Sequence, residues 1–137
     1  MTHAHRIHFL HHGSEESGLG RITTVAQLDD SDGTPGIKRR KLGSYALVYV
    51  QNGSGIYEDS QQTLEVNAGD LILLRPEVEH RYKPSEKTIW NEYFMLFEGP
   101  VFELWEQQGL FPANRPLLKL DPIELWLGRF KEIYAPG

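Results

Sequence analysis

Apolar and polar residues alternate over much of residues 21–97, in short runs that Gly, Asn, Asp and Pro residues separate. Runs of this kind, about ten residues apart, are typical of the strands of an antiparallel sandwich or barrel. The predicted strands cover residues 21–28, 45–50, 55–58, 63–66, 71–74 and 90–97. The pattern therefore predicts a mainly β protein that forms a sandwich or a barrel.

The run at residues 71–74 is entirely apolar, which is typical of a strand that is covered on both faces. Gly69 and Asp70 form the turn before it, and Pro76 ends its ladder because proline has no N–H to donate. His80 and Tyr82 follow just past this strand end. Because barrels bind ligands at their mouths, these two side chains are candidates for a binding site.

Alternation across residues 90–97 predicts a strand with two distinct faces. One face carries Trp90, Glu92, Phe94 and Leu96, and the other carries Asn91, Tyr93, Met95 and Phe97. Glu92 and Phe94 therefore share one face, so a carboxylate and an aromatic ring are expected side by side.

The hydrophobic period changes after residue 98. Pro100 at a first helical position and Gly109 as a stop signal predict a short helix. Its apolar stripe is predicted to consist of Val101, Leu104 and Trp105.

A second helix is indicated by Asp121, Pro122 and Glu124, which supply a cap, a first-turn proline and a reciprocal carboxylate. Helical spacing relates Ile123, Trp126, Leu127, Phe130 and Ile133. This stripe is expected to pack either on the domain's own sheet or on a partner subunit. In the second case, Trp126, Leu127 and Phe130 form the interface of a homodimer.

Composition narrows the function classes. The 137 residues suffice for one domain with its own core, and the absence of Cys excludes disulfides and cysteine nucleophiles. No apolar run of about 18 residues and no signal peptide occurs, so we expect a cytoplasmic protein without membrane contact. The net charge of −5 argues against DNA binding by this segment. The basic run at residues 38–41 is interpreted as a solvated loop or an anion site at the barrel rim.

We expect a flexible N-terminal arm at residues 1–20, a barrel at residues 21–98 and a helical extension at residues 99–137. The arm carries most of the histidines and shows no sustained hydrophobic period. His8, His11 and His12 are close enough in sequence to bind adventitious metal, but a solvated arm is the interpretation we favour.

Together, these elements resemble the N-terminal cupin-type effector-binding domain of AraC-type transcription regulators. The resemblance covers residues 20–130 and rests on residues 45–50 before Gly53-Ser54-Gly55, Leu64, Gly69-Asp70-Leu71, Pro76, His80, Tyr82, Trp90, Phe94, Phe97 and the two helices. It implies a mainly β fold, a cupin or jelly-roll-type β-barrel that binds a small effector, often a sugar, and helices that dimerise. It also implies a separate C-terminal DNA-binding domain of two helix-turn-helix units. No such segment is present here, so we expect the sensor half of a regulator and not an enzyme.

Metal-dependent cupins bind a divalent ion through a His-x-His pair, a Glu and a further His. The corresponding positions here are Asp59, Gln61 and Glu65, which leaves His80 as the one imidazole of the barrel. Because a divalent ion needs three or four converging ligands, we expect neither a metal nor another cofactor.

The predicted effector site comprises Arg39 or Arg40 at the strand entrance, His80 and Tyr82 past Pro76, and Glu92 and Phe94 on the last strand. Rings that stack on sugar faces and polar tips that bond hydroxyls favour a sugar-like effector. For Tyr82, Glu92 and Phe94 the alternative is ordinary barrel packing. For His80 we favour a structural role, in which its ring bonds the backbone of the turn after Pro76.

Two other functions remain open. A stand-alone, metal-free cupin would act as a sugar-binding protein or an isomerase-like enzyme. A metal-dependent dioxygenase or isomerase is the third interpretation, and the missing His-x-His pair counts against it. No nucleophile triad, phosphate loop or pair of catalytic carboxylates stands out in the sequence.

Overall fold

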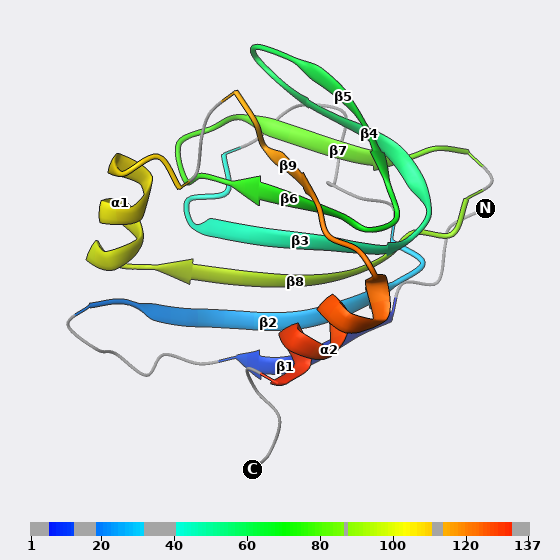
Figure 1. Ribbon diagram of the computed structural model, residues 1–137, viewed down its shortest axis with the longest axis horizontal. Coiled ribbons are helices and arrows are strands. Elements are labelled where there is room, and N and C mark those ends of the chain that lie inside the picture. The colour runs from blue at the N-terminus through cyan, green and yellow to red at the C-terminus, as the bar shows by residue number, and fades with distance from the viewer. Residues whose placement is uncertain (1–5, 13–18, 32–40, 87, 111–113, 133–137) are drawn as a thin grey trace.

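The computed structural model describes residues 6–12, 19–31, 41–86, 88–110 and 114–132. Two antiparallel sheets enclose a barrel-like interior, and two helices lie on the outer face of the larger sheet (Figure 1). The larger sheet has the order β1 (Arg6–His12), β2 (Arg21–Asp29), β8 (Asn91–Glu98), β3 (Tyr45–Asn52), β6 (Asp70–Leu74) and β9 (Leu117–Lys119). The smaller sheet has the order β5 (Thr63–Asn67), β4 (Ser54–Asp59) and β7 (His80–Pro84).

Two apolar clusters hold these layers together. The inner cluster lies between the sheets and is built from Ala46, Val48, Val50, Tyr57, Val66, Ile72, Leu74 and Trp90. The outer cluster lies between the larger sheet and the helices and is built from Val25, Tyr45, Tyr49, Leu71, Tyr93, Met95 and Phe97. Burying apolar surface on both faces of one sheet is the main stabilising contribution to such a fold.

The alternation of β8 is confirmed. Trp90, Phe94 and Leu96 belong to the inner cluster, whereas Tyr93 and Met95 belong to the outer one. The apolar run of β6, residues 71–74, also behaves as predicted, because its residues contribute to both clusters.

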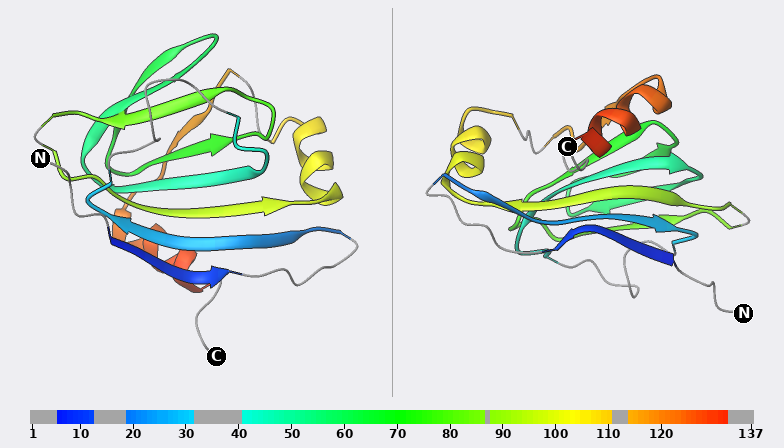
Figure 2. Two further views of the ribbon diagram at one scale, coloured as in Figure 1. Left: turned by 180° about the vertical axis from the view of Figure 1, so that it is seen from behind. Right: turned by 90° about the horizontal axis from the view of Figure 1, so that it is seen from below.

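Helices α1 (Pro100–Gln107) and α2 (Ile123–Glu132) both lie on the same side of the larger sheet (Figure 2). Pro100 is the first residue of α1, and Gly109 adopts a φ of 84° just past its end, as the stop signal predicts. None of the helices described has the length and apolar character needed to cross a membrane.

The predicted stripe of α1 was wrong. Phe102 packs against the outer cluster, with its ring 4.5 Å from that of Phe97, whereas Leu104 and Trp105 are exposed. The helix is short and lies at the edge of the sheet, so only one part of its surface meets the core. Sequence spacing therefore chose the wrong face.

The prediction of an N-terminal arm without regular structure was also wrong for residues 6–12, which form the edge strand β1 and pair with β2. The register shifts between Phe9 and His11, so a bulge interrupts the two-residue period. This bulge explains why the sequence pattern did not reveal the strand. The other arm residues, 1–5 and 13–18, lie outside the described part of the chain.

Two further strands were not predicted. β7 begins at His80, so His80 and Tyr82 belong to a strand of the smaller sheet, and β9 pairs with β6. Both lie at sheet edges, where charged residues and a terminal proline are tolerated. β7 is mostly polar and β9 has only three residues, so neither forms a recognisable hydrophobic run.

Candidate functional site

The barrel interior contains one buried carboxylate. Glu92 is 1% exposed, and its Oε1 atom accepts hydrogen bonds from the Tyr82 hydroxyl and the Trp90 indole N–H, both at 3.0 Å. The Tyr82 hydroxyl lies 3.1 Å from Oε2 as well. Two aromatic residues thus hold a carboxylate inside a mainly apolar barrel.

The neighbours of Glu92 on the larger sheet are apolar. Its cross-strand partners are Leu28 on β2 and Val50 on β3. Burial raises the pKa of Glu92 to about 7, although the hydrogen bonds from Trp90 and Tyr82 favour the charged form. Glu92 therefore exchanges a proton with solvent in the neutral range.

Aromatic rings surround the carboxylate. The Tyr82 and Trp90 rings stack with their centroids 5.6 Å apart, and Phe94 follows Glu92 on the same face of β8. Tyr82 and Phe94 are both partly exposed, whereas Trp90 is fully buried. The cross-strand partners of Phe94 are the small residues Ala26 and Val48. The structure thus brings the predicted site residues Tyr82, Glu92 and Phe94 into one region.

Trp90 was not among the predicted site residues, although it donates to Glu92. The signal was present, because Trp90 and Glu92 are two residues apart on one strand and share its inner face. A buried indole N–H needs an acceptor, and the carboxylate is the nearest polar group of the strand.

His80 lies apart from this group of contacts. Its Nδ1 atom is 3.2 Å from the Val78 carbonyl oxygen, and its ring stacks on Tyr57 with 6.4 Å between centroids. The backbone bond is the one that the structural interpretation of His80 requires. A role of His80 in binding an effector stays a prediction.

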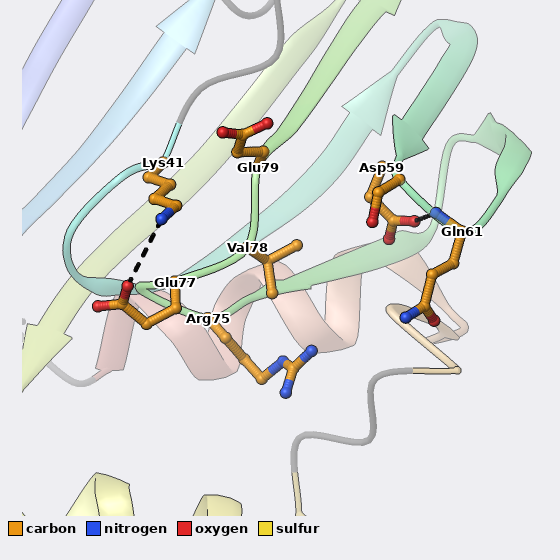
Figure 3. A pocket seen from close by; sticks show the side chains of 8 residues that line it. Lys41, Asp59, Gln61, Arg75, Glu77, Val78 and Glu79 are labelled. Atoms are coloured by element: carbon orange, nitrogen blue, oxygen red, sulfur yellow. Dashed lines mark hydrogen bonds and ion pairs between the residues drawn. The ribbon is translucent and has the colours of Figure 1, made fainter.

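A polar hollow of about 260 Å³ opens beside the ends of β4 and β6 (Figure 3). It is lined by Lys41, Asp59, Ser60, Gln61, Arg75, Glu77, Val78 and Glu79. Both cationic side chains of this lining form ion pairs within the protein: Arg75 contacts Glu106 at 3.3 Å, and Lys41 contacts Glu77 at 3.9 Å. The hollow contains none of the predicted effector residues.

At the positions that bind metal in metal-dependent cupins, this chain has Asp59, Gln61 and Glu65. The Asp59 carboxylate accepts from the Tyr57 hydroxyl at 2.8 Å and from the backbone N–H groups of Gln61 and Gln62. Within the described ranges, no group of three or more His, Asp or Glu side chains is placed to bind a metal ion. These residues therefore do not fit the metal centre of metal-dependent cupins.

Arg39 and Arg40 lie outside the described residues. Three residues of the α2 stripe are partly buried and pack against the outer cluster: Trp126, Leu127 and Phe130. This is the packing on the domain's own sheet that was one of the two alternatives for this stripe. Their role as dimer contacts stays a prediction.

The architecture is that of solved cupin structures. The chain matches the YhaK protein from Escherichia coli (TM-score 0.55, 17% identity), with coverage of 86% of this chain and 52% of that one. It matches the Cnp3 cupin domain from Schizosaccharomyces pombe with a TM-score of 0.52 and 8% identity. This match covers 79% of this chain and 73% of that one. It also matches a cupin 2 conserved barrel domain protein from Salinispora arenicola with a TM-score of 0.51 and 12% identity. This match covers 76% of this chain and 84% of that one.

At these identities, the three structures establish the fold alone. A search of curated proteins gives no significant match. The model of the AraC-like ligand-binding domain, in contrast, matches residues 29–135, which include the whole barrel from β3 onward and both helices. The chain therefore belongs to the family of AraC-like ligand-binding domains.

Proposed function

We propose that this domain senses a small effector for an AraC-type transcription regulator. The effector is a sugar or a sugar-like molecule that binds inside the barrel, beside Tyr82, Glu92 and Phe94. A helix-turn-helix domain elsewhere in the regulator binds DNA in the cytoplasm and reads the state of the sensor. The domain itself performs no catalysis.

The buried carboxylate of Glu92 is the observation that carries this proposal. A barrel interior that serves only stability is best filled by apolar side chains, because burying a charge costs free energy. Here the carboxylate has aromatic neighbours, and two of them, Tyr82 and Phe94, are partly exposed. Apolar walls with few polar groups are typical of sites that orient a small ligand.

Strand β8 offers a route from the effector to the helices. Glu92 and Phe94 face the barrel interior, whereas Tyr93, between them, belongs to the outer cluster under the helices. The Tyr93 hydroxyl donates to the Phe130 carbonyl oxygen of α2 at 2.9 Å. An effector that favours one arrangement of β8 thereby favours one arrangement of α2, which is what an allosteric signal requires. We further propose that Trp126, Leu127 and Phe130 contribute to a homodimer, which sedimentation measures directly.

A thermal-shift screen tests the proposal. The domain is heated with a panel of sugars, sugar acids, amino sugars and other small metabolites, with and without divalent metal ions. A ligand at 100 times its dissociation constant stabilises the fold by about 2.7 kcal/mol, which is a shift of several degrees. Stabilisation by an organic compound without metal supports the proposal. Stabilisation by metal alone, or by no member of the panel, contradicts it.

A further inference from the structure

The Glu92 carboxylate has only neutral partners in the part of the chain that the structure describes. They are the Tyr82 hydroxyl from β7 and the Trp90 indole N–H from the start of β8. The opposing residues on β2 and β3, Leu28 and Val50, carry no polar side-chain group. The deprotonated carboxylate therefore has no cationic partner among the described residues, although buried charges in proteins are usually paired.

We infer that the effector carries a positive charge, an ammonium group in its simplest form, which pairs with Glu92. This inference rests on the proposed function, since it names the chemistry of a ligand at the same site.

A neutral ligand would gain little at this carboxylate. Tyr82 and Trp90 already donate to it, so a sugar hydroxyl that replaced the Tyr82 hydroxyl would exchange one neutral donor for another. An ammonium group adds charge compensation to the hydrogen bond, and charge-assisted hydrogen bonds are about twice as strong as neutral ones.

The rings around Glu92 favour the same chemistry. Trp90 and Tyr82 stack on each other, and Phe94 lies on the same face of β8. The π-faces of such rings attract cations, most strongly where water is excluded. Because Glu92 itself is almost fully buried, the ligand must approach from the partly exposed Tyr82 and Phe94 and displace the Tyr82 hydroxyl.

Matched pairs of probes test the inference by isothermal titration calorimetry at pH 8. In each pair, an amine that is mainly protonated at this pH replaces one hydroxyl: 6-amino-6-deoxy-D-glucose and D-glucose, 6-amino-6-deoxy-D-galactose and D-galactose, cyclohexylamine and cyclohexanol. We expect the charged member of at least one pair to bind 10-fold or more tightly than its neutral counterpart. We expect this ratio to fall toward 1 in Glu92→Gln, which keeps the size of the side chain and removes its charge, and to be unchanged in Glu86→Gln on the exposed surface.

The pH dependence of the unmodified domain gives a second measurement in case the variant folds poorly. Protonation of Glu92 on going from pH 8 to pH 5 removes the charge, so the advantage of the charged member should shrink. Equal binding of both members, a preference that persists in Glu92→Gln, or binding of no charged probe overturns the inference. Tight binding of a neutral sugar in the same experiment overturns the inference but supports the proposed function, whereas failure of the whole thermal-shift panel contradicts the proposed function itself.

Discussion

At the scale of single residues, Glu92 makes the stability of the barrel depend on pH. Its carboxylate is buried, bonded by Tyr82 and Trp90, and next to apolar residues of β2 and β3. In the unfolded chain the same carboxylate is in water. The free energy of unfolding therefore depends on the protonation of this residue.

The substitution Glu92→Gln should make the stability of the domain less dependent on pH. With a pKa of about 7 in the folded state, Glu92 is protonated between about pH 4.5 and 7, whereas the unfolded chain has lost this proton. The folded state then binds more protons, so the unfolding free energy of the native domain falls as pH rises through this window, by up to about 1.4 kcal/mol per pH unit. Relative to Glu92→Gln, the native domain should be comparably stable near pH 4.5 and less stable at pH 8.

Urea denaturation across this pH range measures the difference, with Glu86→Gln as the matched control on the surface. Parallel pH profiles of the native domain and Glu92→Gln would contradict the assignment of Glu92 as a buried carboxylate.

Tyr82→Phe removes the hydroxyl that donates to both oxygens of Glu92. A hydrogen bond to a charged group contributes about 1.5–3 kcal/mol, so this loss in unfolding free energy is expected at pH 8. At pH 5 the carboxylate is neutral, and the loss should be smaller. The double variant Tyr82→Phe/Glu92→Gln should lose less than the sum of the single changes; strict additivity would argue that the two side chains do not interact.

At the scale of elements, the sequence predicted those strands in which each face packs against a single apolar cluster. β8 alternates because it separates two apolar clusters, and residues 71–74 of β6 are all apolar because both faces of this strand are covered. β7 and β9 lie at edges and carry charges, so no hydrophobic period marks them. Within the candidate site, Tyr82, Glu92 and Phe94 followed from strand ends and alternation. The contact between Tyr82 and Glu92 joins different sheets, which no local pattern specifies.

Trp126→Ala tests whether the stripe of α2 is part of the domain's own core. Trp126 packs against the outer cluster and is partly buried, so its removal should lower the unfolding free energy by about 2 kcal/mol, roughly half the cost at a fully buried site. Urea denaturation measures this loss, and sedimentation measures the dimer fraction of the same sample. An unchanged stability with a lower dimer fraction would assign Trp126 to the interface between subunits.

Gly55→Ala tests the close contact between β4 and β7. A Cβ atom at this position would collide with the Lys83 carbonyl oxygen, which is backbone and cannot rotate away. We expect a loss of about 1–3 kcal/mol in unfolding free energy. Gly128→Ala on α2 is the control, since open space surrounds that position and alanine should stabilise the helix by about 0.5–1 kcal/mol. A neutral Gly55→Ala would mean that the two strands are further apart than described.

At the scale of the whole molecule, one sheet connects the candidate site to the helices. The inner face of this sheet carries Glu92 and Phe94, and its outer face carries the outer cluster under α1 and α2. Protein interiors are close-packed. A ligand that shifted β8 would therefore also shift the residues of the outer cluster that pack against it. We therefore expect the proposed sensor to report its ligand through the positions of its helices.

Tryptophan-labelled nuclear magnetic resonance tests the central claim, that a small molecule binds inside the barrel beside Glu92. The three tryptophans separate the regions of the molecule: Trp90 donates to Glu92, Trp105 is on α1, and Trp126 is on α2. The compound that stabilises the domain most in the thermal-shift screen is titrated into the ¹⁵N-labelled protein, with the indole signals assigned by single substitutions. The account predicts that the Trp90 indole N–H signal shifts with the ligand's saturation curve and that Glu92→Gln weakens this response. A saturable shift at Trp105 or Trp126 with a constant Trp90 signal would contradict it.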